Sequence, residues 1–229
     1  IVDTGCGTGI STRALYNAFH ELVVQDQNIP VQSLQVVGVD PGHDMRNTAI
    51  NNTTSSIQFI EGSAENIPLA DQSADLVTAA QAAHWFDRLK FYTEAQRILK
   101  PGGILAIIEN NRNYQKSEFL DKYESFRETC VDPTTQVKYS RHYRDYDYKS
   151  EMAQAFGNCT VHEFEWERVM SMPDFITMAK SSSQVSNARK QLGDSVFEEK
   201  INALLNEYKD ANDQIHVLYT TVARISIKH

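Results

Sequence analysis

Short apolar runs alternate with helical or polar stretches through the first half of the chain. Each run is bounded by turn residues and has the length of a buried strand. The strands predicted in this way are Ile1–Asp3, Leu34–Val39, Ile57–Ile60, Ala74–Ala79 and Ile104–Ile108. Helical spacing of apolar residues predicts helices over Ser11–Val24 and Leu89–Leu99, the second ending at a Lys-Pro-Gly-Gly turn. Strands that alternate with helices over short connections predict a parallel sheet covered on both faces.

The second half of the chain has a different pattern. Residues 111–156 are polar and rich in tyrosine and charge, which predicts a helical insertion over the top of the sheet with helices at Phe119–Cys130 and Ser150–Phe156. Two later strands are predicted at Thr160–Met170 and Val217–Ile227, and helices between them at Pro173–Ser181 and Val196–Tyr208. There is no internal repeat or low-complexity linker, so we expect one domain. Its parts are 1–110, 111–156 and 157–229.

A glycine-rich loop, Asp3-Thr4-Gly5-Cys6-Gly7-Thr8-Gly9, follows the first strand and opens a helix. Glycine permits a positive φ and lets a ligand approach the backbone, and open α/β folds bind ligands at this edge of the sheet. The dinucleotide fingerprint requires a further glycine where this chain has Ile10. Asp3, directly ahead of the loop, suits a positively charged amino group better than a pyrophosphate. Cys6 has no basic neighbour in sequence, so a reactive thiol is disfavoured.

This loop resembles the first motif of the class I S-adenosylmethionine-dependent methyltransferases. Further segments resemble the same family in the same order: Val36–Asp40, Glu61–Leu69, Ser73–Val77, Gln81–Asp87 and Arg97–Gly103. The resemblance covers residues 1–110. It implies that Asp40 accepts hydrogen bonds from the ribose hydroxyls and that Ser63, where Asp is common, lies beside the adenine. The cofactor-binding residues that it implies are Asp3, Gly5, Cys6, Gly7, Gly9, Asp40, Pro41, Met45, Ser63, Ala64, Glu65, Gln81 and Ala82.

The segment Ala82-Ala83-His84-Trp85-Phe86 resembles the branch that holds trans-aconitate methyltransferases. His84 is a candidate for substrate contact and for a general base, or else a packed residue that orients the pocket. Of Trp85 and Phe86, one is expected to line the pocket and the other to enter the core. Arg141 lies in a basic and aromatic stretch, 138–148, that either clamps an anionic substrate or forms local charge pairs in solvent. Ser182 is a further substrate-site candidate, and we expect no metal site.

The fold implied is α/β, Rossmann-like and doubly wound, with a mostly parallel seven-stranded sheet, an antiparallel last strand and a helical insertion after strand five. The reaction implied is methyl transfer from S-adenosylmethionine to oxygen, nitrogen or carbon of a small molecule. A carboxylate acceptor is ionised at neutral pH and needs no base, whereas a phenol or carbon acceptor needs one. The alternatives are a C-methyltransferase of quinone or sterol type and a non-catalytic S-adenosylmethionine-binding protein.

Composition limits the classes of partner that the chain is expected to bind. The chain has 229 residues, 22 basic and 30 acidic, giving a net charge of −8, which argues against wholesale binding of nucleic acid. No apolar run approaches the roughly 20 residues of a membrane helix, so no membrane association is expected. Three cysteines cannot all pair, and a reducing, cytoplasmic setting is the simplest interpretation. A monomer and a dimer remain equally open.

Two expectations concern chain length. Only Ile1 and Val2 precede Asp3, although a strand normally has about five or six residues, so we expect a helical lid segment upstream. The stretch between Gly9 and Asp40 exceeds the roughly 20 residues usual in a Rossmann-type unit, which predicts a surface insertion at Gln25–Ser33.

Overall fold

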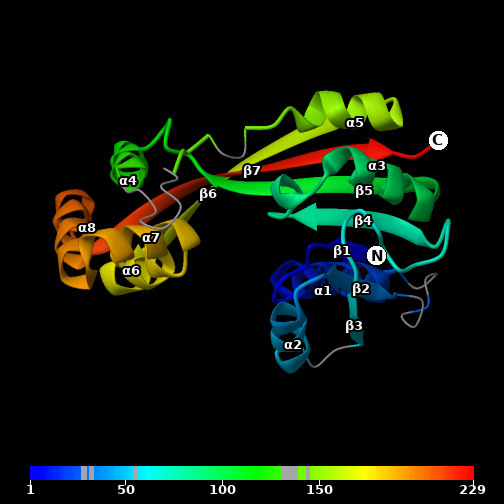
Figure 1. The fold of residues 1–229 in the computed structure, drawn as a ribbon, viewed down its shortest axis with the longest axis horizontal. Helices are drawn as coiled ribbons and strands as arrows, with labels where there is room; N and C mark the ends of the chain where they lie inside the picture. The colour runs from blue at the N-terminus through cyan, green and yellow to red at the C-terminus, as the bar shows by residue number, and fades with distance from the viewer. Residues whose placement is uncertain (27–29, 31–33, 54–55, 130–138, 143–144) are drawn as a thin grey trace. The chain divides into compact units, whose positions relative to one another are not determined.

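A computed structural model describes the chain apart from residues 27–29, 31–33, 54–55, 130–138 and 143–144, and apart from the side chains of 183, 184, 187 and 188. Most of the predicted insertion at Gln25–Ser33 and part of the 138–148 stretch therefore lie outside the described residues. The strands form one seven-stranded sheet in the order β3-β2-β1-β4-β5-β7-β6 (Figure 1). They are β1 (Val2–Thr4), β2 (Val36–Asp40), β3 (Ile57–Glu61), β4 (Ala74–Ala80), β5 (Leu99–Arg112), β6 (Thr160–Ser171) and β7 (Gln214–Ile227).

The strand directions confirm the predicted fold. β1 pairs in parallel with β2 and β4, β2 with β3, and β4 with β5. The last strand, β7, runs antiparallel to the other six, and helices lie on both sides of the sheet. Backbone hydrogen bonds from Gly102 N to Lys228 O (2.7 Å) and from Asn113 N to Leu218 O (2.9 Å) pair opposite ends of β5 and β7.

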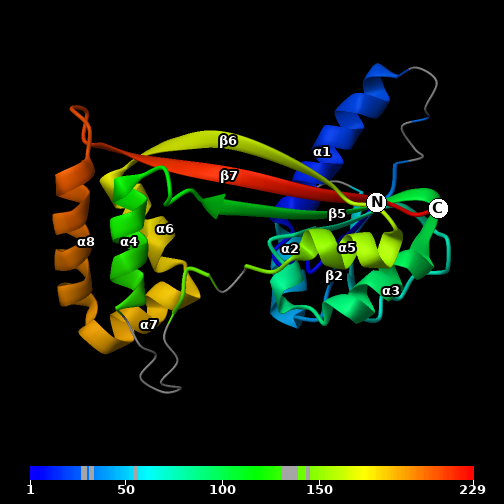
Figure 2. The ribbon, with the colours of Figure 1, turned by 90° about the horizontal axis from the view of Figure 1, so that it is seen from above.

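The chain groups into two compact units, and the first contains Ile1–Glu109, Tyr146–His162 and Val222–His229. Its helices are α1 (Ile10–Gln25), α2 (His43–Asn51), the short 3-10 turn η2 (Ala83–Trp85), α3 (Arg88–Ile98) and α5 (Tyr148–Phe156). Strand and helix residues such as Val39, Val77, Phe91 and Ile107 form its core. Figure 2 shows α3 and α5 side by side, joined by a bidentate ion pair between Arg88 and Glu151 (2.8 and 2.9 Å).

The second unit contains Asn110–Asp145 and Glu163–Thr221. Its helices are α4 (Glu118–Glu128), α6 (Met172–Lys180), α7 (Ser183–Leu192) and α8 (Asp194–Tyr208). Helix α8 packs against α4 and α6 (Figure 2), and the aromatic side chains of Phe119, Tyr123, Phe175 and Phe197 fill the interior.

The structure differs from the sequence-based elements in three respects. Helices α2 and α7 were not predicted. Strand β5 begins at Leu99 rather than Ile104, because Gly102 and Gly103 pair with Lys228 across the sheet. The predicted insertion at 111–156 is divided, since α4 belongs to the second unit and α5 to the first. None of the helices in the described part of the chain combines the length and apolar character needed to cross a bilayer.

Candidate cofactor and acceptor site

The glycine loop lies between β1 and α1 at the carboxyl edge of the sheet. Gly5, Gly7 and Gly9 all have positive φ values, 68°, 54° and 78°. A Cβ on Gly5 would lie 2.7 Å from Ala82 Cβ, and one on Gly9 would lie 2.9 Å from Phe59 Cζ, so both positions are sterically restricted to glycine. A Cβ on Gly7 would meet no described atom within 4 Å. Gly7 therefore presents its backbone to open space, where a ligand can approach it.

Asp40, at the carboxyl end of β2, joins two loops. Its Oδ2 accepts a hydrogen bond from Gly7 N (2.9 Å) and its Oδ1 accepts one from Gly42 N (2.7 Å). Each oxygen of an ionised carboxylate has a further lone pair, so both can accept a second hydrogen bond. The carboxylate is thus oriented by the backbone before any ligand arrives, as a ribose-binding acid requires. Pro41 and Met45 lie beside it, and Met45 keeps half of its surface exposed.

Arg46 on α2 supports this end of the sheet and was missed in the sequence. Its Nη1 donates to the carbonyl oxygen of Asp40 (2.8 Å) and its Nη2 to Glu61 Oε2 at the end of β3 (2.8 Å). The arginine is only 8% exposed, although helix α2 is otherwise polar. No sequence signal separates a buried arginine of this kind from an exposed one.

Asp3 is fully buried, and its oxygens already accept internal hydrogen bonds. Oδ2 accepts from Ser11 Oγ (2.6 Å) and Thr12 Oγ1 (2.7 Å), and Oδ1 accepts from Thr78 Oγ1 (2.9 Å). Burial raises the pKa of Asp3, and the three hydroxyl donors oppose that shift. Asp3 therefore ties β1 to the start of α1 and to β4. Its predicted contact with a ligand amino group stays a prediction.

The segment after β3 carries Ser63, Ala64 and Glu65. Ser63 and Asn66 exchange backbone hydrogen bonds (3.2 and 3.3 Å) in a tight turn, and Ala64 is buried. Glu65 Oε1 accepts from Asp87 N (2.9 Å), which ties this turn to the start of α3. Within the described chain, the Ser63 hydroxyl has no partner and is available to a ligand.

Gln81 and Ala82 follow β4, and Ala82 lies against Gly5 of the glycine loop. Gln81 has a φ of 56°, a left-handed conformation that is uncommon outside glycine, and its N–H donates to Ile108 O (2.9 Å). Strain of this kind persists where surrounding structure enforces it, often at ligand-binding loops. Ala82 is buried against Gly5.

His84 and Trp85 lie in η2. Their ring centroids are 5.0 Å apart, His84 is half-buried, and Trp85 is 76% exposed. Phe86 packs against Phe91 in the core (centroids 5.0 Å apart). Phe86 is therefore the ring of the pair that packs on the core, and the pocket-lining role of Trp85 stays a prediction. The substrate and base roles of His84 stay predictions.

Cys6 is a buried free thiol. Burial and, to a smaller extent, the nearby carboxylates of Asp3 and Asp40 raise its pKa to about 12. The thiol is therefore protonated at neutral pH, which leaves Cys6 a small packing residue in the loop.

Arg141 and Ser182 belong to the second unit. The Arg141 guanidinium donates to Asp121 Oδ1 (2.5 Å), Glu128 Oε2 (3.0 Å) and Ser125 Oγ (2.8 Å). Arg141 therefore forms local charge pairs in the structure. Ser182 precedes α7 as its N-cap residue and accepts from Ser186 N through its carbonyl (2.9 Å). A substrate role for either stays a prediction.

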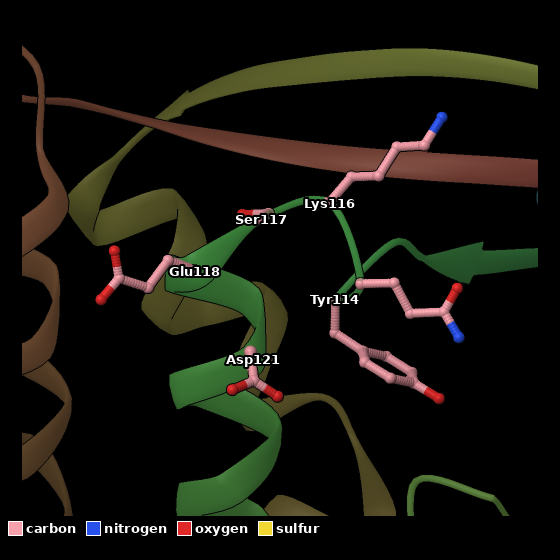
Figure 3. Close-up of a pocket in the computed structure, with 6 residues that line it drawn as sticks. Tyr114, Lys116, Ser117, Glu118 and Asp121 are labelled. Carbon is pink, nitrogen blue, oxygen red and sulfur yellow. The ribbon is translucent and has the colours of Figure 1, made fainter.

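An open pocket in the second unit lies at the connection from β5 to α4. It is lined by Tyr114, Gln115, Lys116, Ser117, Glu118 and Asp121 (Figure 3). Lys116 Nζ donates to Glu165 Oε1 (2.6 Å), and Asp121 pairs with Arg141. Its charged groups are therefore largely paired within the protein. Among the described residues, no group of three or more His, Cys, Asp or Glu side chains is placed to hold a metal ion.

Several known proteins are similar to this chain. Residues 2–107 match the methyltransferase domain family. The chain is 29% identical over 215 residues to a candidate methyltransferase of Dictyostelium discoideum, covering 91% of this chain and 73% of that protein. It is 28% identical over 158 residues to a ubiquinone/menaquinone biosynthesis C-methyltransferase of Campylobacter jejuni, covering 68% of this chain and 63% of that protein.

A solved structure shares the fold. A candidate type II methyltransferase from Anaeromyxobacter dehalogenans superposes with a TM-score of 0.70 at 22% identity, covering 100% of this chain and 90% of that one.

Proposed function

We propose that this chain is an S-adenosylmethionine-dependent methyltransferase that methylates a small molecule, with a carboxylate oxygen as the acceptor atom. The observation that carries the proposal is the state of the acidic groups at the glycine loop. Asp3 is fully buried against three hydroxyl donors, and the Cys6 thiol is buried and protonated. Neither can take a proton from an acceptor, which favours an acceptor that is already ionised.

The residues of the first unit fit the cofactor by their own geometry. Asp40 is oriented by Gly7 N and Gly42 N and retains acceptor capacity for two ribose hydroxyls. Gly7 leaves room for a ligand against the backbone, and the Ser63 hydroxyl is available to the adenine amino group. S-adenosylmethionine, when bound, supplies a methyl group made electrophilic by the adjacent sulfonium. The contribution of the chain is alignment and exclusion of water, for which the exposed ring of Trp85 is a candidate wall.

A second candidate is methylation at carbon of a quinol-like ring. Similarity to the Campylobacter C-methyltransferase favours it. A carbon nucleophile needs a base to remove a proton, and His84 in η2 is the candidate for that role.

Methyl-labelled S-adenosylmethionine and a panel of carboxylates and quinols separate the two candidates. We expect label in carboxylate products, released as methanol by alkali because a methyl ester is base-labile. His84→Gln should leave that transfer within about threefold of the parent, as should the control His162→Gln on exposed β6. Label in a quinol that withstands alkali and also hydriodic acid, which cleaves an aryl methyl ether, and that is lost in His84→Gln alone, would establish the second candidate instead. Binding of S-adenosylhomocysteine without turnover of any acceptor would identify a non-catalytic binding protein.

A further inference from the structure

Arg112, the last residue of β5, lies in the second unit with part of its guanidinium group unused. Its Nε donates to Glu124 Oε1 on α4 (3.1 Å), and the side chain is 22% exposed. Among the described residues, its two Nη nitrogens have no hydrogen-bond acceptor. An arginine fork that bonds through Nε alone retains four N–H donors for a planar oxyanion.

Glu124 cannot by itself balance Arg112, because it serves other donors as well. Arg127 Nη1 donates to both Glu124 oxygens (2.8 and 2.7 Å), and the Tyr139 hydroxyl donates to Oε2 (2.9 Å). Glu124 and Arg127 are 3% and 4% exposed. One buried carboxylate therefore bonds to two guanidinium groups, and an anion at the remaining N–H donors of Arg112 would satisfy them.

Tyr123 adds a neutral donor at the same place. It precedes Glu124 on α4, its side chain is fully buried, and its hydroxyl has no partner in the described part of the chain. The Cζ atoms of Arg112 and Arg127 lie 5.3 and 5.6 Å from its ring centroid. Burial raises the pKa of Tyr123, so the phenol keeps its proton, and a buried unbonded hydroxyl costs free energy unless a ligand accepts from it.

The sheet face next to these groups carries polar side chains that form hydrogen bonds with one another. Residues two apart on a strand share a face, so Asn110 lies on the face of Arg112. Thr221 Oγ1 donates to Asn110 Oδ1 (3.1 Å) and accepts from Trp166 Nε1 (2.9 Å). The ring of Tyr219 stacks on Trp166 with centroids 4.6 Å apart. This face thus supplies an aromatic wall, and Arg112 supplies its free donors.

We propose that Arg112 and Tyr123 form a binding site for a small oxyanion, a carboxylate or phosphate group. Arg112 offers paired N–H donors from its Nη atoms, and Tyr123 donates its O–H to the same anion. The oxyanion site itself rests only on the side chains of the second unit.

Isothermal titration of the full chain with succinate and, separately, with inorganic phosphate tests the site. Both titrations are run with S-adenosylhomocysteine present. We expect saturable binding of one of the two probes, and the tighter probe identifies carboxylate or phosphate as the group recognised. Arg112→Gln should weaken that binding about tenfold or more, and Tyr123→Phe about three- to tenfold, as for loss of charged and neutral donors. The control Arg189→Gln removes the same charge from a surface pair with Asp194 and should leave binding unchanged.

The two variants together separate a loss of anion binding from a loss of folding. Tyr123→Phe keeps the packed ring, so it decides the question if circular dichroism shows Arg112→Gln to be unfolded. Parental affinity for both probes in folded Arg112→Gln or Tyr123→Phe would overturn the site. Binding of S-adenosylhomocysteine with no binding of either anion would also overturn it while the methyltransferase assignment stands. Anion binding without S-adenosylhomocysteine binding would instead remove the proposed function and leave the oxyanion site in place.

Discussion

Asp40 shows how one side chain can shape a loop and receive a ligand. Asp40→Ala removes the carboxylate that we predict to accept hydrogen bonds from two ribose hydroxyls, and it also releases Gly7 N and Gly42 N. We expect S-adenosylhomocysteine to bind about 1.5–3 kcal/mol more weakly, the usual range for hydrogen bonds to a charged group. Isothermal titration measures this directly. Asp75→Ala is the control, since Asp75 pairs with Lys100 on the surface; equal affinity in parent and Asp40→Ala would remove the ribose assignment.

Gln81 combines a left-handed backbone with a place beside the glycine loop. Gln81→Gly should raise the free energy of unfolding by about 0.5–1 kcal/mol, because glycine adopts positive φ without steric cost. The added backbone freedom should at the same time weaken S-adenosylhomocysteine binding. Gln72→Gly is matched, with a φ of 51° in another turn, and should stabilise without changing the affinity. Equal effects of the two changes on binding would mean that the strain at Gln81 does not serve the cofactor site.

Sequence motifs identified candidate residues whose neighbours in the chain define their role. They did not identify residues whose role depends on partners far away in the sequence. The glycine loop and Asp40 were predicted because strand, turn and acid are adjacent in the chain. Arg141 and Arg112 could not be distinguished in this way. The charge of Arg141 is met by Asp121 and Glu128, whereas Arg112 shares Glu124 with Arg127, and only the fold shows the difference.

At the scale of elements, length was harder to predict than type. All seven strands were predicted, since apolar runs between turns are a local signal. The start of β5 was not, because its Lys-Pro-Gly-Gly segment is a turn signal that pairing with Lys228 overrides. Helix α2 was missed because it buries only Arg46 and Ala49 and so lacks an apolar stripe.

Arg97 on α3 fastens the segment that follows β3. Its guanidinium donates to the carbonyl oxygens of Ile67 and Leu69 (2.8 Å each) and pairs with Glu94 and Asp71. Arg97→Lys keeps the charge but cannot reach all of these acceptors, so we expect a loss of about 1–2 kcal/mol in the free energy of unfolding. Urea denaturation measures it. Lys100→Arg, in an exposed pair with Asp75, should change stability by less than about 0.5 kcal/mol, and a similar result for Arg97→Lys would contradict the fastening role.

At the scale of the molecule, the two units are not separate lengths of chain. The chain passes from one to the other within β5, β6 and β7, and a fourth time between α4 and α5, at residues 145 and 146. Shared strands couple the stability of both units, so we expect a single cooperative unfolding transition.

The two tryptophans test this expectation, since Trp85 lies in the first unit and Trp166 in the second. Trp85→Phe leaves fluorescence that reports the second unit, and Trp166→Phe leaves fluorescence that reports the first. In each variant, the fluorescence midpoint in urea should coincide with the midpoint from circular dichroism. Separated midpoints within one variant would show that the units unfold independently.

The position of Val222–His229 in the first unit has a consequence for biosynthesis. A ribosome releases residues 1–109 long before it makes the end of β7. Yet Gly102 and Gly103 exchange backbone hydrogen bonds with Lys228. The Lys228 side chain also donates from Nζ to Gln96 O and Leu99 O (2.6 and 2.7 Å). Until those residues emerge, the edge of β5 has open backbone donors and acceptors, a surface on which nascent chains aggregate. Folding of the first unit during translation must therefore wait for residues made more than a hundred positions later, a period in which a chaperone would be most useful.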